Sequence, residues 1–262
     1  MPRGGHRGRG EIELAHRPHP PPVPDQGAKA GGRRIGHEAT LRPPVLRGPS
    51  PRGNRERTPE REKVGPSSEL QGAVMRLPIL SPETAPPASR TILDGIEADL
   101  GFVPNLAATI AASPVLLAGF DGLRRAVGDA SFDAVHREIA GVAVGVAVDN
   151  AYGVAFHSTV LARLGVDPQD IEAMRGGSEP RDAVHAAVYA FARAVVIDRG
   201  AVAEAVVQRA LDAGLQPAEL LDLVTECAFA GLVGLVDNLA GRVELDEPLR
   251  PQAWKAPRPG RR

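Results

Sequence analysis

The sequence predicts an all-α protein, and three observations point to this fold class. Apolar residues recur at helical spacing through most of residues 75–262. The same region shows no convincing alternation of apolar and polar residues, the pattern expected of a half-buried strand. Residues typical of helix starts and ends, such as Ser113 with Pro114 and Gly101, stand at the boundaries of the periodic segments.

The first helices follow from these signals in chain order. Residues 89–101 carry three apolar residues on one stripe and end at a glycine. Residues 102–113 predict a loop and then a short helix, and Ser113 caps a third helix that begins at Pro114.

The helix predicted at 132–149, with Ser131 as its N-cap, is the most apolar. After Glu138 it is apolar on all sides, so its second half should be buried. The chain from Arg242 is mixed and contains proline, with Trp254 as its only large anchor. The remaining predicted helices are 150–164, 167–175, 179–198, 203–214 and 216–241.

Residues 1–74 have a different composition. They contain 12 Pro and 12 Gly, no Phe, Trp or Tyr, and 14 basic against 8 acidic residues. Such a segment buries too little apolar surface to offset its chain entropy, so it is predicted to be disordered. Three interpretations stay open: a non-functional extension ahead of a true start at Met75, a linker, or an Arg-Gly nucleic-acid arm. The arm lacks the aromatic residues that would stack on bases.

Composition also limits the function of residues 75–262. Their 17 basic and 24 acidic residues give a mildly acidic domain without the basic footprint of a nucleic-acid-binding protein. The apolar runs are too short to span a bilayer, and no signal-peptide-like stretch appears. The single cysteine, Cys227, rules out an intramolecular disulfide, so a cytoplasmic location is expected. Neither a glycine-rich phosphate loop nor metal-ligand spacing is found, so no cofactor or metal is expected.

The stretch "DNAYGVAFHSTVLARLG" contains the main candidate for chemistry. His157 lies four residues after Gly153 and seven after Asn150, so the three share one helical face, with the glycine leaving room above the ring. Glu138 is the last charge before the apolar run of the preceding helix. A carboxylate beside an imidazole is a usable acid–base pair. The alternative is a core histidine with satisfied hydrogen bonds and an unrelated first-turn glutamate.

The longer stretch "REIAGVAVGVAVDNAYGVAFHSTVLARLG" resembles the core of the alkylhydroperoxidase D and carboxymuconolactone decarboxylase superfamily. The usual form has Arg-Glu before an apolar helix, then Cys-x-x-Cys, then a histidine four residues after the second cysteine. Glu138 and His157 fall on the relay glutamate and the histidine, and Tyr152 falls on a common aromatic position. The upstream "LGFVPNLAATIAASPVLLAGF" resembles the peroxidase-related branch.

The resemblance covers roughly residues 78–245. It implies a compact multi-helix alkylhydroperoxidase D-like domain at 75–245, followed by a C-terminal tail at 246–262.

The two cysteine positions of this family motif are Asn150 and Gly153 here. A dithiol peroxidase needs an attacking and a resolving thiol, so this chemistry should be absent. Cys227 lies alone in an apolar stretch and reads as a small buried hydrophobe. The decarboxylase side of the superfamily works without the cysteine pair. The resemblance therefore implies that His157 gives or takes the proton while Glu138 orients it.

Other residues are secondary candidates. A substrate carboxylate is expected to meet Arg137, Arg124 or Arg125, each of which is otherwise a surface charge. His185 and Tyr189, one turn apart, line either the same cavity or the flank of a packed stripe. His136 is expected to face solvent.

Three functions follow as expectations. The first is acid–base chemistry on a small organic acid, lactone or related carbonyl compound. The second is peroxidase-type oxidoreduction through Cys227 or a partner's thiol, and the third is a non-catalytic oligomeric or ligand-binding role. A homo-oligomer is expected because residues 139–148, 184–196 and 221–236 are apolar on more than one face. Besides further copies of itself, the protein is expected to bind a small-molecule substrate and to bind neither nucleic acid nor a membrane.

Overall fold

The computed structural model describes residues 75–130 and 132–256, which fold into helices and contain no strand. The predicted all-α class is therefore confirmed for this part of the chain. The predicted disordered extension, residues 1–74, lies outside the described residues, as do Ser131 and residues 257–262.

The nine observed α-helices match the nine predicted helices in order across the described region, with ends that differ by a few residues, and a 3₁₀ helix follows them that was not predicted. Their bounds are α1 Pro87–Leu100, α2 Asn105–Ile110, α3 Pro114–Gly128, α4 Ala134–Ala147, α5 Ala151–Arg163, α6 Pro168–Arg175, α7 Ala183–Ile197, α8 Glu204–Asp212, α9 Pro217–Leu239 and a 3₁₀ helix η1 Glu247–Gln252.

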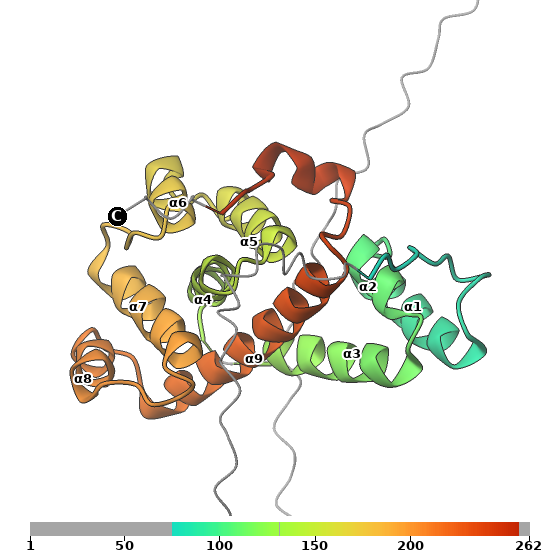
Figure 1. Cartoon of the computed structure of the whole chain (residues 1–262). Helices are drawn as coiled ribbons and strands as arrows, with labels where there is room; N and C mark the ends of the chain where they lie inside the picture. The colour runs from blue at the N-terminus through green and yellow to red at the C-terminus, as the bar shows by residue number, and fades with distance from the viewer. Residues whose placement is uncertain (1–74, 131, 257–262) are drawn as a thin grey trace, which may run out of the picture. The chain divides into compact units, whose positions relative to one another are not determined.

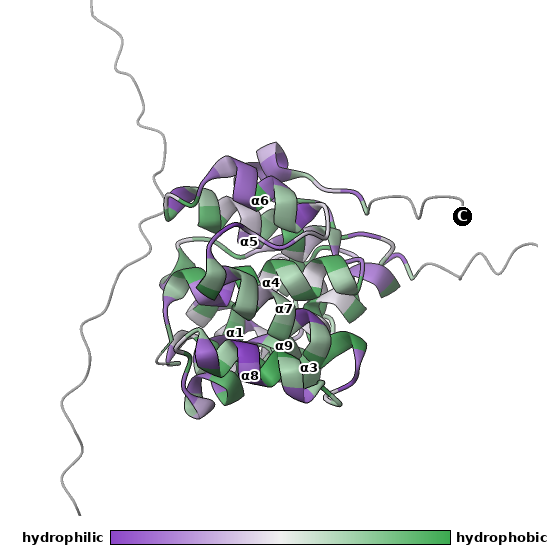
Figure 2. Ribbon diagram, turned by 90° about the vertical axis from the view of Figure 1, so that its left-hand side faces the viewer, coloured by the Kyte–Doolittle hydropathy of each residue, from purple (hydrophilic) through white to green (hydrophobic). Residues whose placement is uncertain are grey.

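Helix α4 occupies the centre of this arrangement (Figure 1). It packs against α5, α7 and α9, while α3 packs against α9, and α1 packs against α3. Helix α8 lies against α7. Residues 138–145 are buried, as expected for a helix that is apolar on all sides. Figure 2 shows the same pattern in colour, because α4 is mostly hydrophobic whereas the outer helix α6 is largely hydrophilic.

The buried apolar side chains form two clusters. One contains residues of α4, α7 and the first half of α9, with Tyr189 and Leu223 among its members. The other contains residues of α1, α2, α3 and the second half of α9, together with Tyr152 at the start of α5. Helix α9 therefore contributes to both clusters, and so does α5, because its Leu161 belongs to the first.

Helix caps explain most of the boundaries. The Ser113 side chain accepts a hydrogen bond from the Leu116 amide at the start of α3, and Gly101 ends α1 in the left-handed conformation with φ 78°, both as predicted. The predicted Ser131 cap of α4 is wrong, because the Asp133 side chain accepts from the Val135 amide instead. Both residue types cap helices well, so composition alone does not choose between them.

The segment predicted as a C-terminal tail is part of the fold as far as residue 256. Helix η1 packs against α5. The Asp246 carboxylate accepts hydrogen bonds from the Tyr152 hydroxyl and the Asn105 amide. The buried Trp254 ring donates from Nε1 to the Arg175 carbonyl. The boundary expected at residue 245 therefore does not mark the end of the packed chain.

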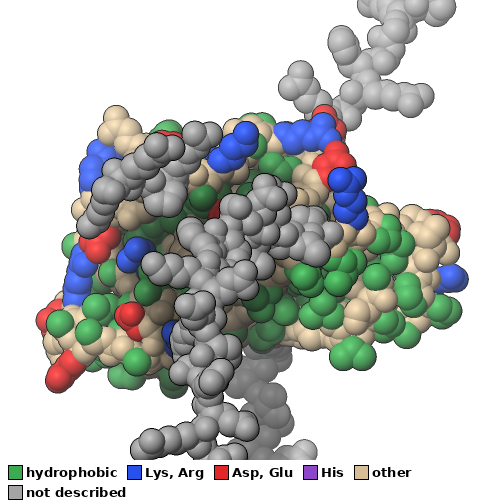
Figure 3. Space-filling view, viewed as in Figure 1, with side chains coloured by type: hydrophobic (Ala, Val, Ile, Leu, Met, Phe, Trp, Pro, Cys, Tyr) green, Lys and Arg blue, Asp and Glu red, His purple; other side chains and the backbone are tan. Residues whose placement is uncertain are grey.

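The surface carries several large apolar side chains. Figure 3 shows hydrophobic atoms gathered on the part of this face where Figure 1 places α1, α2 and α3. The most exposed large apolar residues are Val115 of α3 and Leu221 and Leu235 of α9. Among the described helices, none combines the length and hydrophobicity needed to cross a membrane.

Candidate active site

The structure brings Glu138 of α4 and His157 of α5 into direct contact. Oε2 of Glu138 lies 2.8 Å from Nδ1 of His157. Both side chains are buried, with exposed fractions of 3% for Glu138 and 7% for His157. An ionised carboxylate only accepts hydrogen bonds, so the ring donates from Nδ1 and its other nitrogen, Nε2, is left for a different partner.

The histidine ring lies against Gly141 rather than over Gly153. A Cβ atom at residue 141 would come within 2.3 Å of the ring, so only glycine permits this approach. A Cβ atom at residue 153 would instead meet the Asn150 side chain. The prediction that Gly153 leaves space for the His157 ring is therefore wrong. The glycine that faces the ring is on α4, and helical spacing within α5 does not reveal it.

Electrostatics favour an ion pair at this contact. Burial raises the pKa of Glu138, but the hydrogen bond and charge of His157 and the charge of Arg137 outweigh burial and leave this pKa below its usual value. Burial lowers the pKa of His157, but the hydrogen bond and charge of Glu138 reverse the shift and leave it raised. Arg137 donates from Nε to Oε1 of Glu138 at 2.8 Å. Arg137, predicted to meet a substrate carboxylate, therefore lies at the site and is already paired with Glu138.

Glu226 of α9 is a third member of the cluster that the sequence analysis missed. Its Oε1 atom lies 3.7 Å from Nε2 of His157, beyond hydrogen-bond distance. The residue is 1% exposed, and Oε1 has no hydrogen-bond partner among the residues that the structure describes. Burial raises the pKa of Glu226 to about 8. One sequence signal was available, because Glu226 is the single charge within the apolar stretch that runs from Leu223 to Val236.

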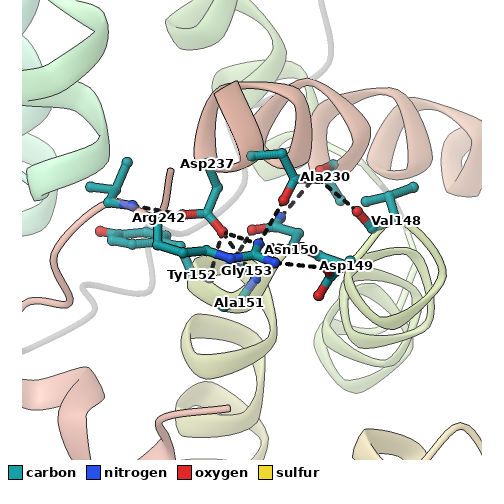
Figure 4. Close-up of polar contacts among 11 residues, drawn as sticks. Val148, Asp149, Asn150, Ala151, Tyr152, Gly153, Ala230, Asp237 and Arg242 are labelled. Carbon is teal, nitrogen blue, oxygen red and sulfur yellow. Dashed lines mark hydrogen bonds and ion pairs between the residues drawn. The ribbon is translucent and has the colours of Figure 1, made fainter. Parts of the chain in front are cut away.

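The N-terminus of α5 is held by polar contacts of its own (Figure 4). Asn150 is the N-cap, and its Oδ1 accepts from the Gly153 amide at 2.8 Å. The Asp237 carboxylate, from the end of α9, accepts from the amides of Ala151 and Tyr152. A carboxylate is the group that a helix N-terminus favours. Asp237 therefore supplies the negative charge that this helix end favours.

Arg242 and Asp237 extend this network. Arg242 donates to Asp237 at 3.0 Å and also to the Asp149 carbonyl. Asp149 has a left-handed backbone with φ 55°, in the tight turn between α4 and α5. These contacts hold the turn at which the superfamily that the sequence resembles has its two cysteines, and Asn150 and Gly153 here serve helix capping.

The secondary candidates are not part of the Glu138–His157 contact. The Tyr189 hydroxyl donates to the Met174 carbonyl, and the Tyr152 hydroxyl donates to Asp246. His185 lies beside His136, with ring centroids 5.7 Å apart. His136 is half-buried rather than solvent-facing, because α4 and α7 pack together at that point.

Two other expectations concern arginine and cysteine side chains. Arg124 and Arg125 both bind Asp121 of their own helix, and both also pair with Asp99 of α1, so they form a separate ion-pair network. Cys227 is buried, and burial raises the pKa of its thiol to about 12. Among the described residues, no group of three or more His, Cys, Asp and Glu side chains is placed to hold a metal ion.

Comparisons with known proteins agree with this fold. Residues 114–196, which run from the start of α3 to the last turn of α7, match the model of the Carboxymuconolactone decarboxylase family. A comparison of the sequence with curated proteins gives no significant match.

Three solved structures are similar to this chain over most of their length. The first is described as an alkylhydroperoxidase AhpD core and uncharacterized peroxidase-related protein from Ralstonia eutropha JMP134. It has a TM-score of 0.59 and 22% identity over 66% of this chain and 93% of that chain. A peroxidase-related protein from Silicibacter sp. TM1040 has a TM-score of 0.55 and 19% identity, covering 70% of this chain and 96% of that one.

The third similar structure is a variant of the debrominase Bmp8 in complex with 2,3,4-tribromopyrrole. It has a TM-score of 0.56 and 16% identity, covering 68% of this chain and 95% of that chain. At these identities the three structures establish a shared fold, and the chemistry of this chain is argued from its own residues.

Proposed function

We propose that this chain, which belongs to the carboxymuconolactone decarboxylase and alkylhydroperoxidase D-like superfamily, performs acid–base chemistry on a small organic acid, lactone or related carbonyl compound. The observation that carries this proposal is the buried 2.8 Å contact between Glu138 and Nδ1 of His157. A carboxylate that orients an imidazole and raises its pKa prepares the ring to exchange a proton.

Each residue has a distinct role in this proposal. Glu138 holds the Nδ1 proton and fixes the ring orientation, so the reacting proton is exchanged at Nε2. His157 would remove a proton next to a carbonyl group or return one to a carbanion. Arg137, whose side chain is 32% exposed, anchors Glu138 and places a positive charge near the site for an anionic substrate.

The residues give less support to a thiol peroxidase. The chain has a single cysteine, and the raised pKa of Cys227 keeps it as a thiol at neutral pH. Asn150 and Gly153, at the family's cysteine positions, serve helix capping. The debrominase relative was solved with a small ring compound, which supports a small-molecule substrate for this fold.

The proposal is tested with a ligand screen followed by kinetics. Small mono- and diacids, lactones and other carbonyl compounds are first screened by thermal shift, and compounds that bind are assayed for turnover. His157→Gln and Glu138→Gln should each lower the rate by about 10²- to 10⁴-fold. The rate of the double variant should be only slightly lower than that of the less active single variant, because the two groups act as a unit.

A matched control is His185→Gln, which changes a half-buried histidine outside this contact and should keep full activity. Full activity of His157→Gln would refute the acid–base proposal. Binding without any turnover in the native protein would favour the non-catalytic alternative, and peroxide turnover abolished by Cys227→Ala would favour the peroxidase alternative.

A further inference from the structure

Glu226 occupies an unusual environment for a carboxyl group. It lies in the middle of α9, next to Cys227 and among the buried residues of that helix. Within residues 75–130 and 132–256 its Oε1 atom has no hydrogen-bond partner, although nearly all buried polar atoms in folded proteins have one. A buried polar atom without a partner is costly, so this carboxyl group calls for a physical explanation.

The ionisable groups whose charges act on Glu226 are the proposed acid–base pair and the arginine that binds it. They are His157 of α5 and Glu138 and Arg137 of α4. Oε1 of Glu226 lies 3.7 Å from Nε2 of His157, on the side of the ring away from Glu138. The imidazole therefore has a carboxyl group at each of its two nitrogens, one in hydrogen-bond contact and the other just beyond it.

The two carboxyl groups differ in charge because their surroundings differ. Glu138 receives hydrogen bonds from both His157 and Arg137, which favour its ionised form. Among the described residues no donor reaches Oε1 of Glu226, and an ionised carboxylate with a buried oxygen that lacks a partner is very unfavourable inside a protein. Burial accordingly raises the pKa of Glu226 to about 8, so the group is neutral at pH 7.

The separation of Nε2 and Oε1 also suits proton exchange. At 3.7 Å the two atoms are too far apart for a direct hydrogen bond. One oxygen atom, about 2.9 Å from each, would be able to bond to both. Proton transfer through a single water is an established route between an acid and a base.

We propose that Glu226 is the proton-holding partner of His157, a positioning residue whose neutral carboxyl group faces Nε2 and replaces the proton that the ring gives up. This inference rests on the proposed acid–base function. After His157 donates its Nε2 proton to the substrate, the Glu226 carboxyl group gives its proton to Nε2 and becomes a carboxylate. That carboxylate regains a proton from water, so the cycle leaves both residues unchanged.

The inference predicts that the two groups titrate together. In the native protein, ionisation of Glu226 near pH 8 places a negative charge beside Nε2 and keeps the ring protonated to higher pH. Glu226→Gln removes that charge while keeping a similar shape, so His157 should lose its proton at lower pH. We expect the acid dissociation constant of the ring to rise about tenfold, a shift of one pKa unit.

The decisive measurement is a pH titration of the His157 ring by NMR, with ¹³C- and ¹⁵N-labelled histidine and no substrate present. The native protein, Glu226→Gln and Cys227→Ala are compared. Cys227→Ala changes the neighbouring buried side chain of α9 without changing charge, so its titration should match that of the native protein. An unchanged His157 titration in Glu226→Gln would overturn the inference.

A second measurement covers the case in which Glu226→Gln does not fold. Infrared spectra of the native protein with labelled glutamate should show one neutral carboxyl band at pH 7 that disappears as the pH rises through 8. The lack of any neutral carboxyl group at pH 7 would likewise overturn the inference. Once a substrate is found, Glu226→Gln should move the alkaline limb of the kcat profile to lower pH, whereas Cys227→Ala should not.

These outcomes separate the two proposals. Full turnover in His157→Gln refutes the acid–base function, whether or not the ring titration depends on Glu226. Loss of turnover in His157→Gln with a ring titration that is independent of Glu226 leaves the acid–base function standing and refutes the role of Glu226 alone.

Discussion

The imidazole of His157 lies directly against the backbone of Gly141. A Cβ atom at residue 141 would come 2.3 Å from the ring carbon Cε1 and 2.4 Å from both ring nitrogens. Real side chains do not approach so closely. The contact between Glu138 and His157 therefore depends on the absence of a side chain one turn further along α4.

Gly141→Ala should break this arrangement. The added methyl group forces the ring away from Glu138, and overpacking of this kind typically costs about 1–3 kcal/mol of the free energy of unfolding. Chemical denaturation measures that loss, and the NMR signals of His157 report the displaced ring. Gly119→Ala is the control, because α3 leaves open space there. That change should be neutral or stabilise by up to about 1 kcal/mol. A Gly141→Ala protein as stable as the native one would contradict the close contact.

The stability of the protein should depend on pH through Glu226. Its folded pKa of about 8 lies above the unfolded value near 4.5, so between these values the folded state holds a proton that the unfolded state lacks. The free energy of unfolding should then fall as pH rises through this window, by at most about 1.4 kcal/mol per pH unit. His157, whose pKa is also raised, acts in the same direction above pH 6.5.

The comparison with Glu226→Gln isolates the glutamate. Urea denaturation of both proteins from pH 5 to pH 9 should show a shallower decline in the variant. Parallel curves would mean that Glu226 is already ionised in the folded protein at low pH.

Asn150 and Gly153 should be energetically coupled. A Cβ atom at residue 153 would lie 2.3 Å from Nδ2 of Asn150, so Gly153→Cys displaces the N-cap side chain, a loss worth about 1 kcal/mol. Asn150→Cys removes the same N-cap and also the amide group that a side chain at residue 153 would meet. The double variant should therefore be less destabilised than the sum of the two single variants.

Denaturation of the native protein, the two single variants and the double variant gives the coupling energy. Thiol titration before and after oxidation shows whether the new cysteines pair, and a peroxide assay shows whether they consume peroxide. Strict additivity of the two substitutions would show that the side chains do not interact.

Helix α9 carries an exposed apolar stripe, defined by Leu221, Val224, Ala228, Leu235 and Leu239. With the half-buried Gly231 between Ala228 and Leu235, successive positions lie three or four residues apart, as at the seam of paired helices. Such a stripe is complementary to itself, so we expect a second copy of this chain to cover it. The buried residues 139–145 of α4, by contrast, are covered within one chain and give no support to an oligomer.

Light scattering at micromolar concentration should then show an oligomer for the native protein. Leu235→Glu should shift it toward the monomer, because the substitution buries an unpaired charge in the contact. Val115→Glu, on α3 at an even more exposed position, should leave the mass unchanged. A monomeric native protein would rule out this interface.

The sequence predicted the helices well because caps and apolar periodicity are local signals. Ser113 and Gly101 marked helix boundaries correctly for this reason. Glu138 and His157 are 19 positions apart, so no local signal predicts that they pair. Their pairing was expected from the family resemblance.

Glu226, Asp237 and Gly141 were missed as site residues because their roles arise between helices. Nothing in the periodicity of α9 shows that Glu226 faces the imidazole of α5 or that Asp237 reaches the amides of Ala151 and Tyr152. The packing of the C-terminal segment was missed for the same reason. The hydrogen-bond partners of Asp246 and Trp254 are 94 and 79 residues away in the sequence.

The first described residue adjoins the last residue of the longest helix. The Met75 amide donates a hydrogen bond to the Leu239 carbonyl at 3.0 Å, at the C-terminal end of α9. A shortened protein that begins at Met75 would place a free α-ammonium group there in place of an amide. Helix C-termini favour positive charge by about 0.3–1 kcal/mol, so the new chain end would be electrostatically matched to its location.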